Sequence, residues 1–238
     1  MPRRPEGHGS VLVAEDLLLC LTDDRTGRLV VSGSTVDVGL GGALLVELAL
    51  RGRVAVAAAG ERIRRGHLVV RDPTPTADPV LDDALAAVRA KEGRKPQHVV
   101  GGLGKGRRAQ LYERLAAAGA VRREERRVLG LFPGRRWPAA DVDRARGLRD
   151  RLAVALQHGA TDDARVAALV SLLAALDALH RVVVPAQVGL TRRELQERAK
   201  QIAAGEWAGK AVRDAIAGMN AAVTAAITVT IATGAGGS

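Results

Sequence analysis

Residues Ala43 to Leu50 form an apolar run that Glu47 alone interrupts. A helix that is apolar on nearly every face has to be surrounded by protein. The run therefore predicts a central buried helix, and we interpret the preceding string Gly39-Leu40-Gly41-Gly42 as a turn that leads into it. Only four of the 238 residues are aromatic, so Ala and Leu have to fill the core, which favours closely packed helices.

The rest of the sequence predicts a mainly α fold. The clearest helix start is Asp78-Pro79, an N-cap followed by a first-turn proline. Helices are expected over residues 11–21, from 79 to about 91, from about 105 to 118, and from 141 almost to the end, with breaks near 158–159, 185–189 and 205. A strand is expected at 29–31, an irregular stretch at 91–104, and two hairpins, one pairing 54–58 with 67–71 and one pairing 121–132 with 136 onward across Pro133-Gly134-Arg135. We expect a single compact helical domain with peripheral β-hairpins over residues 11–233, between a flexible N-terminus (1–10) and a flexible tail (234–238).

Signals for export or membrane insertion are weak. Cys20 is the only cysteine, so it has no partner for a disulfide or a CxxC site. No apolar segment of signal-peptide form precedes Glu15 and Asp16. The uncharged stretch from Ala215 to Thr233 has the length of a span, but Asn220 and several threonines favour a buried C-terminal helix. The sequence therefore predicts a cytoplasmic protein.

The positive charge is concentrated in the middle of the chain. The sequence has 36 Lys and Arg against 26 Asp and Glu, a net charge of +10. Residues 89–151 contain 18 basic and 7 acidic residues, a net of +11, whereas all other residues together net −1. Such a local excess predicts an anionic partner, and the lack of aromatic rings favours phosphates of a membrane or a duplex over single-stranded bases. A solvated basic face without a dedicated partner is the alternative.

The string Gly101-Gly102-Leu103-Gly104-Lys105-Gly106-Arg107-Arg108 is the strongest local indication of an anion site. Glycines allow backbone N–H groups to point at an anion, the following helix start adds a positive dipole, and Lys105, Arg107 and Arg108 add full charges. The string is not a Walker A motif, because Gly106 and not Ser or Thr follows Lys105. A simple turn before a helix is the structural alternative.

Patterns typical of catalysis or metal binding are weak. The five histidines are far apart, and no HExxH or GxSxG motif occurs. Cys20 lies in an apolar segment and is expected to be a small buried side chain. The adjacent aspartate pairs lie where turns and helix starts are expected, so capping explains them. The sequence therefore indicates no metal, no cofactor and no enzymatic activity.

Residues 39–53, GLGGALLVELALRGR, resemble the signature helix of the Golgi phosphoprotein 3 family. The strings EDLLL at 15–19 and DPVLDDAL at 78–85 support the resemblance, which extends from about Leu12 to the C-terminal helix. It implies a single, mainly helical domain that binds membranes peripherally. Eukaryotic members recognise phosphatidylinositol 4-phosphate on Golgi membranes and hold glycosyltransferases there by their cytosolic tails. The composition, rich in Ala and Arg, suggests a bacterial member.

The resemblance also implies where a lipid would bind. The family pocket uses a Trp and an Arg near the signature helix and two Arg at the start of a later helix. Ser32 and Gly41 occupy the first two positions here, and Lys105 and Arg108 occupy the second two. With the neighbouring Arg107, these are the expected lipid-binding residues, and phosphate binding is the part of the family chemistry that is retained.

The family further uses a hairpin after that later helix to oligomerise. This hairpin corresponds to residues 121–137, with Leu129, Leu131 and Phe132 as the expected contacts in a homo-oligomer. Packing of these side chains on their own domain is the alternative.

The expected function is therefore that of a non-enzymatic adaptor that docks reversibly on anionic phospholipid headgroups. A winged-helix-like nucleic-acid-binding protein is the main alternative, with residues 105–118 as recognition helix and the following hairpin as wing. Glu113 on that helix counts against it, and only Gln110 and Arg114 are suited to read bases, so nucleic acid is not the favoured partner. An enzyme acting on lipids or nucleotides would need a catalytic pair that the sequence does not indicate.

Overall fold

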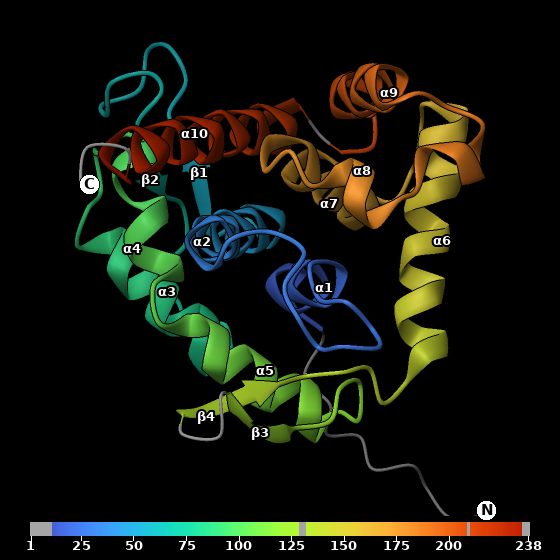
Figure 1. Ribbon diagram of the computed structural model, residues 1–238. Helices are drawn as coiled ribbons and strands as arrows, with labels where there is room; N and C mark the ends of the chain where they lie inside the picture. Colours follow the sequence, from blue (N-terminus) through green and yellow to red (C-terminus); the bar gives the residue numbers. More distant parts are fainter. Residues whose placement is uncertain (1–10, 129–131, 209, 235–238) are drawn as a thin grey trace, which may run out of the picture.

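The computed structural model describes residues 11–128, 132–208 and 210–234, which form a mainly α fold (Figure 1). The α-helices are α1 (Val13–Cys20), α2 (Gly33–Leu50), α3 (Pro79–Arg89), α4 (Val100–Gly104), α5 (Arg107–Ala117), α6 (Val142–His158), α7 (Ala164–Ala175), α8 (Leu179–Val182), α9 (Arg192–Ala204) and α10 (Lys210–Gly234). The 3-10 helices are η1 (Pro96–His98) and η2 (Pro185–Val188), and the strands are β1 (Val54–Val56), β2 (Leu68–Val70), β3 (Glu124–Val128) and β4 (Phe132–Arg136). The predicted fold class, mainly helical with small β-hairpins, is confirmed.

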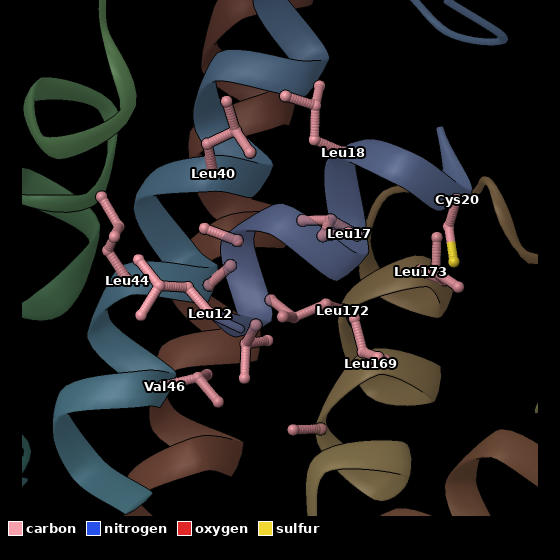
Figure 2. Close-up of a cluster of buried hydrophobic side chains, with 14 of the residues drawn as sticks. Leu12, Leu17, Leu18, Cys20, Leu40, Leu44, Val46, Leu169, Leu172 and Leu173 are labelled. Carbon is pink, nitrogen blue, oxygen red and sulfur yellow. The ribbon is translucent and has the colours of Figure 1, made fainter. Parts of the chain in front are cut away.

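Helix α2 is the central helix that the apolar run predicted. Every residue from Val38 to Ala49 is buried, and α1, α4, α7 and α10 pack around the helix (Figure 1). Figure 2 shows how aliphatic side chains of three helices fill this core: Leu12 and Leu17 at α1, Leu40, Leu44 and Val46 on α2, and Leu169 and Leu172 on α7. Aliphatic packing thus supplies the core of a chain with few aromatic rings.

The carboxylate of Glu47, inside this apolar helix, is fully satisfied. Its oxygens accept hydrogen bonds from the backbone N–H of Val13 at 2.8 Å and from Nε of Arg51 at 2.8 Å. The guanidinium of Arg165 forms a third contact, with Nη2 3.1 Å from Oε2. A buried charge is tolerated only when it is paired in this way, so Glu47 ties α1 and α7 to the central helix.

The string Gly39–Gly42 lies inside α2, so the predicted turn before the helix is wrong. The helix begins at Gly33, six residues earlier. An interior glycine costs a helix about 1 kcal/mol relative to alanine, but here it allows α2 to touch α4. A Cβ at Gly41 would lie 1.8 Å from a carbonyl oxygen of α4, and a Cβ at Gly104 would lie 1.7 Å from a carbonyl oxygen of α2. The two helices therefore cross with their backbones in contact.

The remaining differences from the sequence prediction are local. The hairpin of β1 and β2 is confirmed, with Val54 opposite Val70. The hairpin of β3 and β4 is confirmed as well, but Val128 lies opposite Phe132, so residues 133–135 belong to β4 and not to the reversal of the chain. The predicted strand at 29–31 is reduced to one bridge between residues 22 and 29. The stretch 91–104, expected to be irregular, contains η1 and α4.

The C-terminal half follows its predicted breaks. Helix α6 ends at Gly159, which has a φ of 69°, and η2 and Gly205 separate the later helices. Helix α10 lies against α2 and buries Ala215, Ile216 and Val223, but Ala217, Ala221 and Thr224 are exposed, so the helix predicted to be buried is buried on one face. Within the described ranges α2 alone is long and apolar enough to cross a bilayer, and 72% of that window is buried by the surrounding protein.

Candidate functional site: an arginine-lined cavity

A cavity of about 680 Å³ opens beside the first turns of α2 and α5. Its walls come from the loop between α1 and α2, from these two helix starts, and from the end of β4. The lining residues are Gly27, Arg28, Leu29, Val31, Gly33, Asp37, Gly106, Arg108, Ala109, Tyr112, Arg135, Arg136 and Trp137. The volume lies within the range of small-molecule sites, about 300–1,000 Å³.

Four arginines and a single carboxylate line this cavity, a net charge of +3. Arg108 faces Asp37, with Nε 3.3 Å from Oδ1 and Nη2 3.4 Å from Oδ2. These distances exceed the 2.7–2.9 Å typical of charge-assisted hydrogen bonds. Oδ1 of Asp37 is buried without a hydrogen-bond partner among the described residues. Asp37 therefore pairs with Arg108 by charge, without a short hydrogen bond that would hold the guanidinium in place.

The other three arginines of the cavity are not paired with carboxylates in the described part of the chain. Arg136 donates a hydrogen bond from Nη1 to the carbonyl oxygen of Thr26 at 3.4 Å. Arg28 and Arg135 have no carboxylate within 4 Å among the described residues. Three segments distant in sequence thus bring guanidinium groups to the same cavity, with N–H donors that no carboxylate of the described residues occupies. This arrangement suits an anion with several oxygens.

The floor of the cavity is a rigid aromatic stack. The rings of Tyr112 on α5 and Trp137 after β4 lie parallel, with centroids 4.9 Å apart. The hydroxyl of Tyr112 lies 2.7 Å from that of Thr22, and burial raises the pKa of the phenol. Gly27 passes so close to Trp137 that a Cβ would lie 2.4 Å from its backbone nitrogen. These contacts hold the end of β4, and with it Arg136, against the loop before α2.

The three expected basic residues point to different places. Arg108 lines the cavity. Arg107 turns toward α3, where Nη1 lies 2.8 Å from a carboxylate oxygen of Asp83. Lys105 is exposed at the end of α4 and is not among the cavity residues. The glycines at 101, 102 and 104 belong to α4, so of the predicted phosphate-binding string only Gly106 and Arg108 lie in the cavity wall.

Ser32 and Gly41, which occupy the family's first two pocket positions, do not line the cavity. Ser32 is the N-cap of α2 and accepts a hydrogen bond from the backbone N–H of Thr35 at 3.2 Å. Its neighbours Val31 and Gly33 do line the cavity, so Ser32 stands at its edge. Gly41 is buried at the contact of α2 with α4.

The expected oligomerisation contacts fall mostly outside the described residues. Leu129 and Leu131 lie there, and Phe132 opens β4.

Much of the middle-segment charge is neutralised by nearby carboxylates. Arg122 pairs with Glu124, and Arg123 pairs with Glu113 and Glu125. The two base readers of the winged-helix alternative are also engaged: Gln110 accepts a hydrogen bond from Arg107, and Arg114 pairs with Glu15 and Asp78 at 2.8 and 2.9 Å. On the helix expected to read bases, both side chains are thus bonded to other residues of the protein.

Sequence reasoning missed Arg28, Asp37 and Trp137 as cavity residues. Nothing in the local sequence around Arg28 shows that its loop meets β4. The structure shows this contact in the close approach of Gly27 to Trp137 and in the hydrogen bond from Arg136 to the carbonyl oxygen of Thr26. Arg135 and Arg136 lie in the basic segment 89–151, but their position in the cavity wall depends on the register of the β3–β4 hairpin.

The fold and the cavity define a helical domain with an open, cationic surface site. Residues 13–219 match the model of the family described as Golgi phosphoprotein 3 (GPP34), and the chain belongs to this family. The match covers nearly the whole chain and confirms the resemblance of the sequence. The family comprises non-enzymatic adaptors that bind phosphoinositide lipids and associate peripherally with Golgi membranes.

Proposed function

We propose that this protein is a cytoplasmic adaptor that attaches to membranes by binding a phosphorylated headgroup, like that of phosphatidylinositol 4-phosphate, in the arginine cavity. Family membership supports lipid binding in general. The observation that carries the specific proposal is the convergence of Arg28, Arg108, Arg135 and Arg136 on one open cavity.

A phosphate monoester suits this cavity better than a simple counter-ion. Planar guanidinium groups donate paired hydrogen bonds that match phosphate oxygens. Helices α2 and α5 also begin at the cavity, and the dipoles at their N-termini favour negative charge there. Arg135 and Arg136 from β4 add positive charge to the cavity, which the buried Gly41 does not line.

Cosedimentation with phosphatidylcholine vesicles tests the proposal. Vesicles that carry phosphatidylinositol 4-phosphate should retain the protein better than vesicles that carry phosphatidylinositol. Each hydrogen bond to a charged group contributes about 1.5–3 kcal/mol, so the double variant Arg108→Ala, Arg135→Ala should bind at least 100-fold more weakly. The variant Arg122→Ala, Arg123→Ala removes the same charge from carboxylate-paired surface positions and serves as the control.

Equal binding to both vesicle types, or full binding by the Arg108/Arg135 variant, would refute the assignment. Greater retention by duplex DNA than by vesicles would favour the nucleic-acid alternative.

The adaptor role also requires a protein partner. Cytosolic tails of membrane enzymes are the proposed cargo, by analogy with the family. A homo-oligomer formed through the β3–β4 hairpin remains part of the proposal, and analytical ultracentrifugation of a Phe132→Ser variant tests it.

A further inference from the structure

We propose that a second surface, distinct from the cavity, contacts an anionic bilayer through six exposed cations on two adjoining turns. We call it the turn surface, and it consists of Arg62, Arg64, Arg65, Lys91, Arg94 and Lys95. The first three stand between β1 and β2, and the other three stand between α3 and η1. The sequence count concealed the first three, because residues 1–88 contain more acidic than basic residues.

Among the described residues, no carboxylate forms an ion pair with the turn surface. All six side chains are exposed, and none takes part in an ion pair with another described residue. The two acidic residues of these turns are directed elsewhere. Glu61 binds Nη2 of Arg71 at 2.7 Å, and Glu92 accepts a hydrogen bond from the backbone N–H of Val70 at 2.8 Å. The six positive charges are therefore available to an external anion.

Backbone hydrogen bonds join the α3–η1 turn to Leu68, the first residue of β2, where the β1–β2 turn ends. The N–H of Leu68 donates to the carbonyl oxygen of Arg94 at 2.8 Å, and the N–H of Gly93 donates to that of Leu68 at 2.9 Å. Gly93 has a φ of 75°, a conformation that favours glycine, so this turn is specified locally. Figure 1 shows the β1–β2 turn projecting from the body, well away from the β3–β4 hairpin.

The chemistry of the turn surface favours a bilayer over a nucleic acid. Ile63 stands between Arg62 and Arg64, so an apolar side chain accompanies the cations in the same turn. That pairing suits a membrane interface, where phosphates and acyl chains lie close together. Neither turn carries an aromatic ring for base stacking, and neither cluster of cations lies on a helix long enough to enter a groove.

Basic residues also link the turn surface to the cavity. Nζ of Lys91 lies near α4, 3.5 Å from where a Cβ of Gly102 would be. Exposed Lys105 follows α4 and precedes the cavity residues Gly106 and Arg108. The turn surface does not require the cavity to bind a phosphoinositide.

Vesicles without any phosphoinositide provide the test. The wild-type protein should bind phosphatidylcholine vesicles that contain phosphatidylserine and should not bind phosphatidylcholine alone. Each cation near such a surface strengthens binding about fivefold, so the variant Arg62→Glu, Arg64→Glu, Arg94→Glu should bind at least about 100-fold more weakly. The control variant Arg146→Glu, Arg193→Glu, Lys200→Glu makes the same change of charge on α6 and α9 and should bind like the wild type.

Undiminished binding by the turn-surface variant, or an equal loss in the control, would overturn the proposal. Duplex DNA can be added in an amount that carries the same negative charge as the vesicles. If it displaces the protein from the vesicles, the turn surface binds nucleic acid instead. Calorimetry with soluble glycerophosphoinositol 4-phosphate separates the two sites. The turn-surface variant should bind this ligand like the wild type. If the wild type does not bind the ligand, the cavity assignment fails, and the comparison with phosphatidylserine vesicles still tests the turn surface. Circular dichroism establishes that each variant is folded.

Discussion

The substitution Asp37→Asn tests how the cavity sets its affinity for anions. Asp37 contributes the single carboxylate among the cavity residues and faces Arg108 at 3.3 Å. The side chains of Arg108 and Asp37 are 35% and 24% exposed, so water reaches both. Asparagine removes the negative charge but keeps an oxygen that can accept a hydrogen bond from the guanidinium. Arg108 should therefore keep its position while the repulsion felt by a bound anion disappears.

The size of the effect follows from Coulomb's law. An anion that contacts Arg108 would lie about 5 Å from Asp37, and at a water-like dielectric constant of about 80 the repulsion is about 1 kcal/mol for each negative charge. Removal of that repulsion should tighten binding about fivefold for a monoanion and about thirtyfold for a dianion. The gain should shrink as salt is added, because the cavity is open to screening ions.

Calorimetric titration with glycerophosphoinositol and with its 4-phosphate measures both effects, because the two ligands differ only in the additional phosphate. The larger gain is expected for the 4-phosphate. Weaker binding by Asp37→Asn would show that the carboxylate orients Arg108, and identical gains for the two ligands would show that the anion does not lie close to Asp37. Either result would refute the electrostatic argument.

Three further predictions concern stability. Gly41→Ala would place a methyl 1.8 Å from a carbonyl oxygen of α4 and should cost about 3 kcal/mol or more in urea denaturation, whereas Gly101→Ala, with open space around it, should cost nothing. Burial raises the pKa of Asp16 to about 6, so its ionisation opposes folding. Asp16→Asn should therefore add about 3 kcal/mol above about pH 7, and this gain should vanish below about pH 3, where Asp16 is protonated in both states; an equal gain at pH 4 and pH 8 would contradict this. Arg114→Ala leaves two nearly buried carboxylates unpaired and should lower the free energy of unfolding by about 3 kcal/mol, whereas Arg122→Ala, at a more exposed pair, should cost less than about 1 kcal/mol.

The sequence allowed the elements of the fold to be predicted wherever local signals dominate. Asp78 does cap α3, and its carboxylate accepts hydrogen bonds from two backbone N–H groups of the first turn. The break at Gly159 also follows from a local preference for positive φ. Gly39–Gly42 was misinterpreted because its glycines allow close packing against other elements, and Gly41 touches α4, some sixty residues away in sequence. Helix propensity alone cannot distinguish glycines of a turn from glycines at a close contact between two helices.

The candidate site was only partly predictable for a similar reason. Arg108 was identified because it follows a glycine at a helix start, which is a local pattern. Arg28 and Arg136 reach the same cavity only because Gly27 lies against Trp137, a contact between residues more than a hundred positions apart. Lys105 and Arg107 share the local pattern of Arg108, yet the direction of each side chain depends on its position around the start of α5.

The backbone contact of α4 with α2 has a consequence for the dimensions of the cavity in this protein. Helix α4 ends only three residues before α5 begins, so the contact fixes the distance between the start of α5 and the start of α2. The width of the opening therefore depends on Gly41 and Gly104, neither of which lines the cavity. Substitutions in the loop before α2 and in β4 can then change the side chains that line the cavity, while the frame that holds them keeps its dimensions.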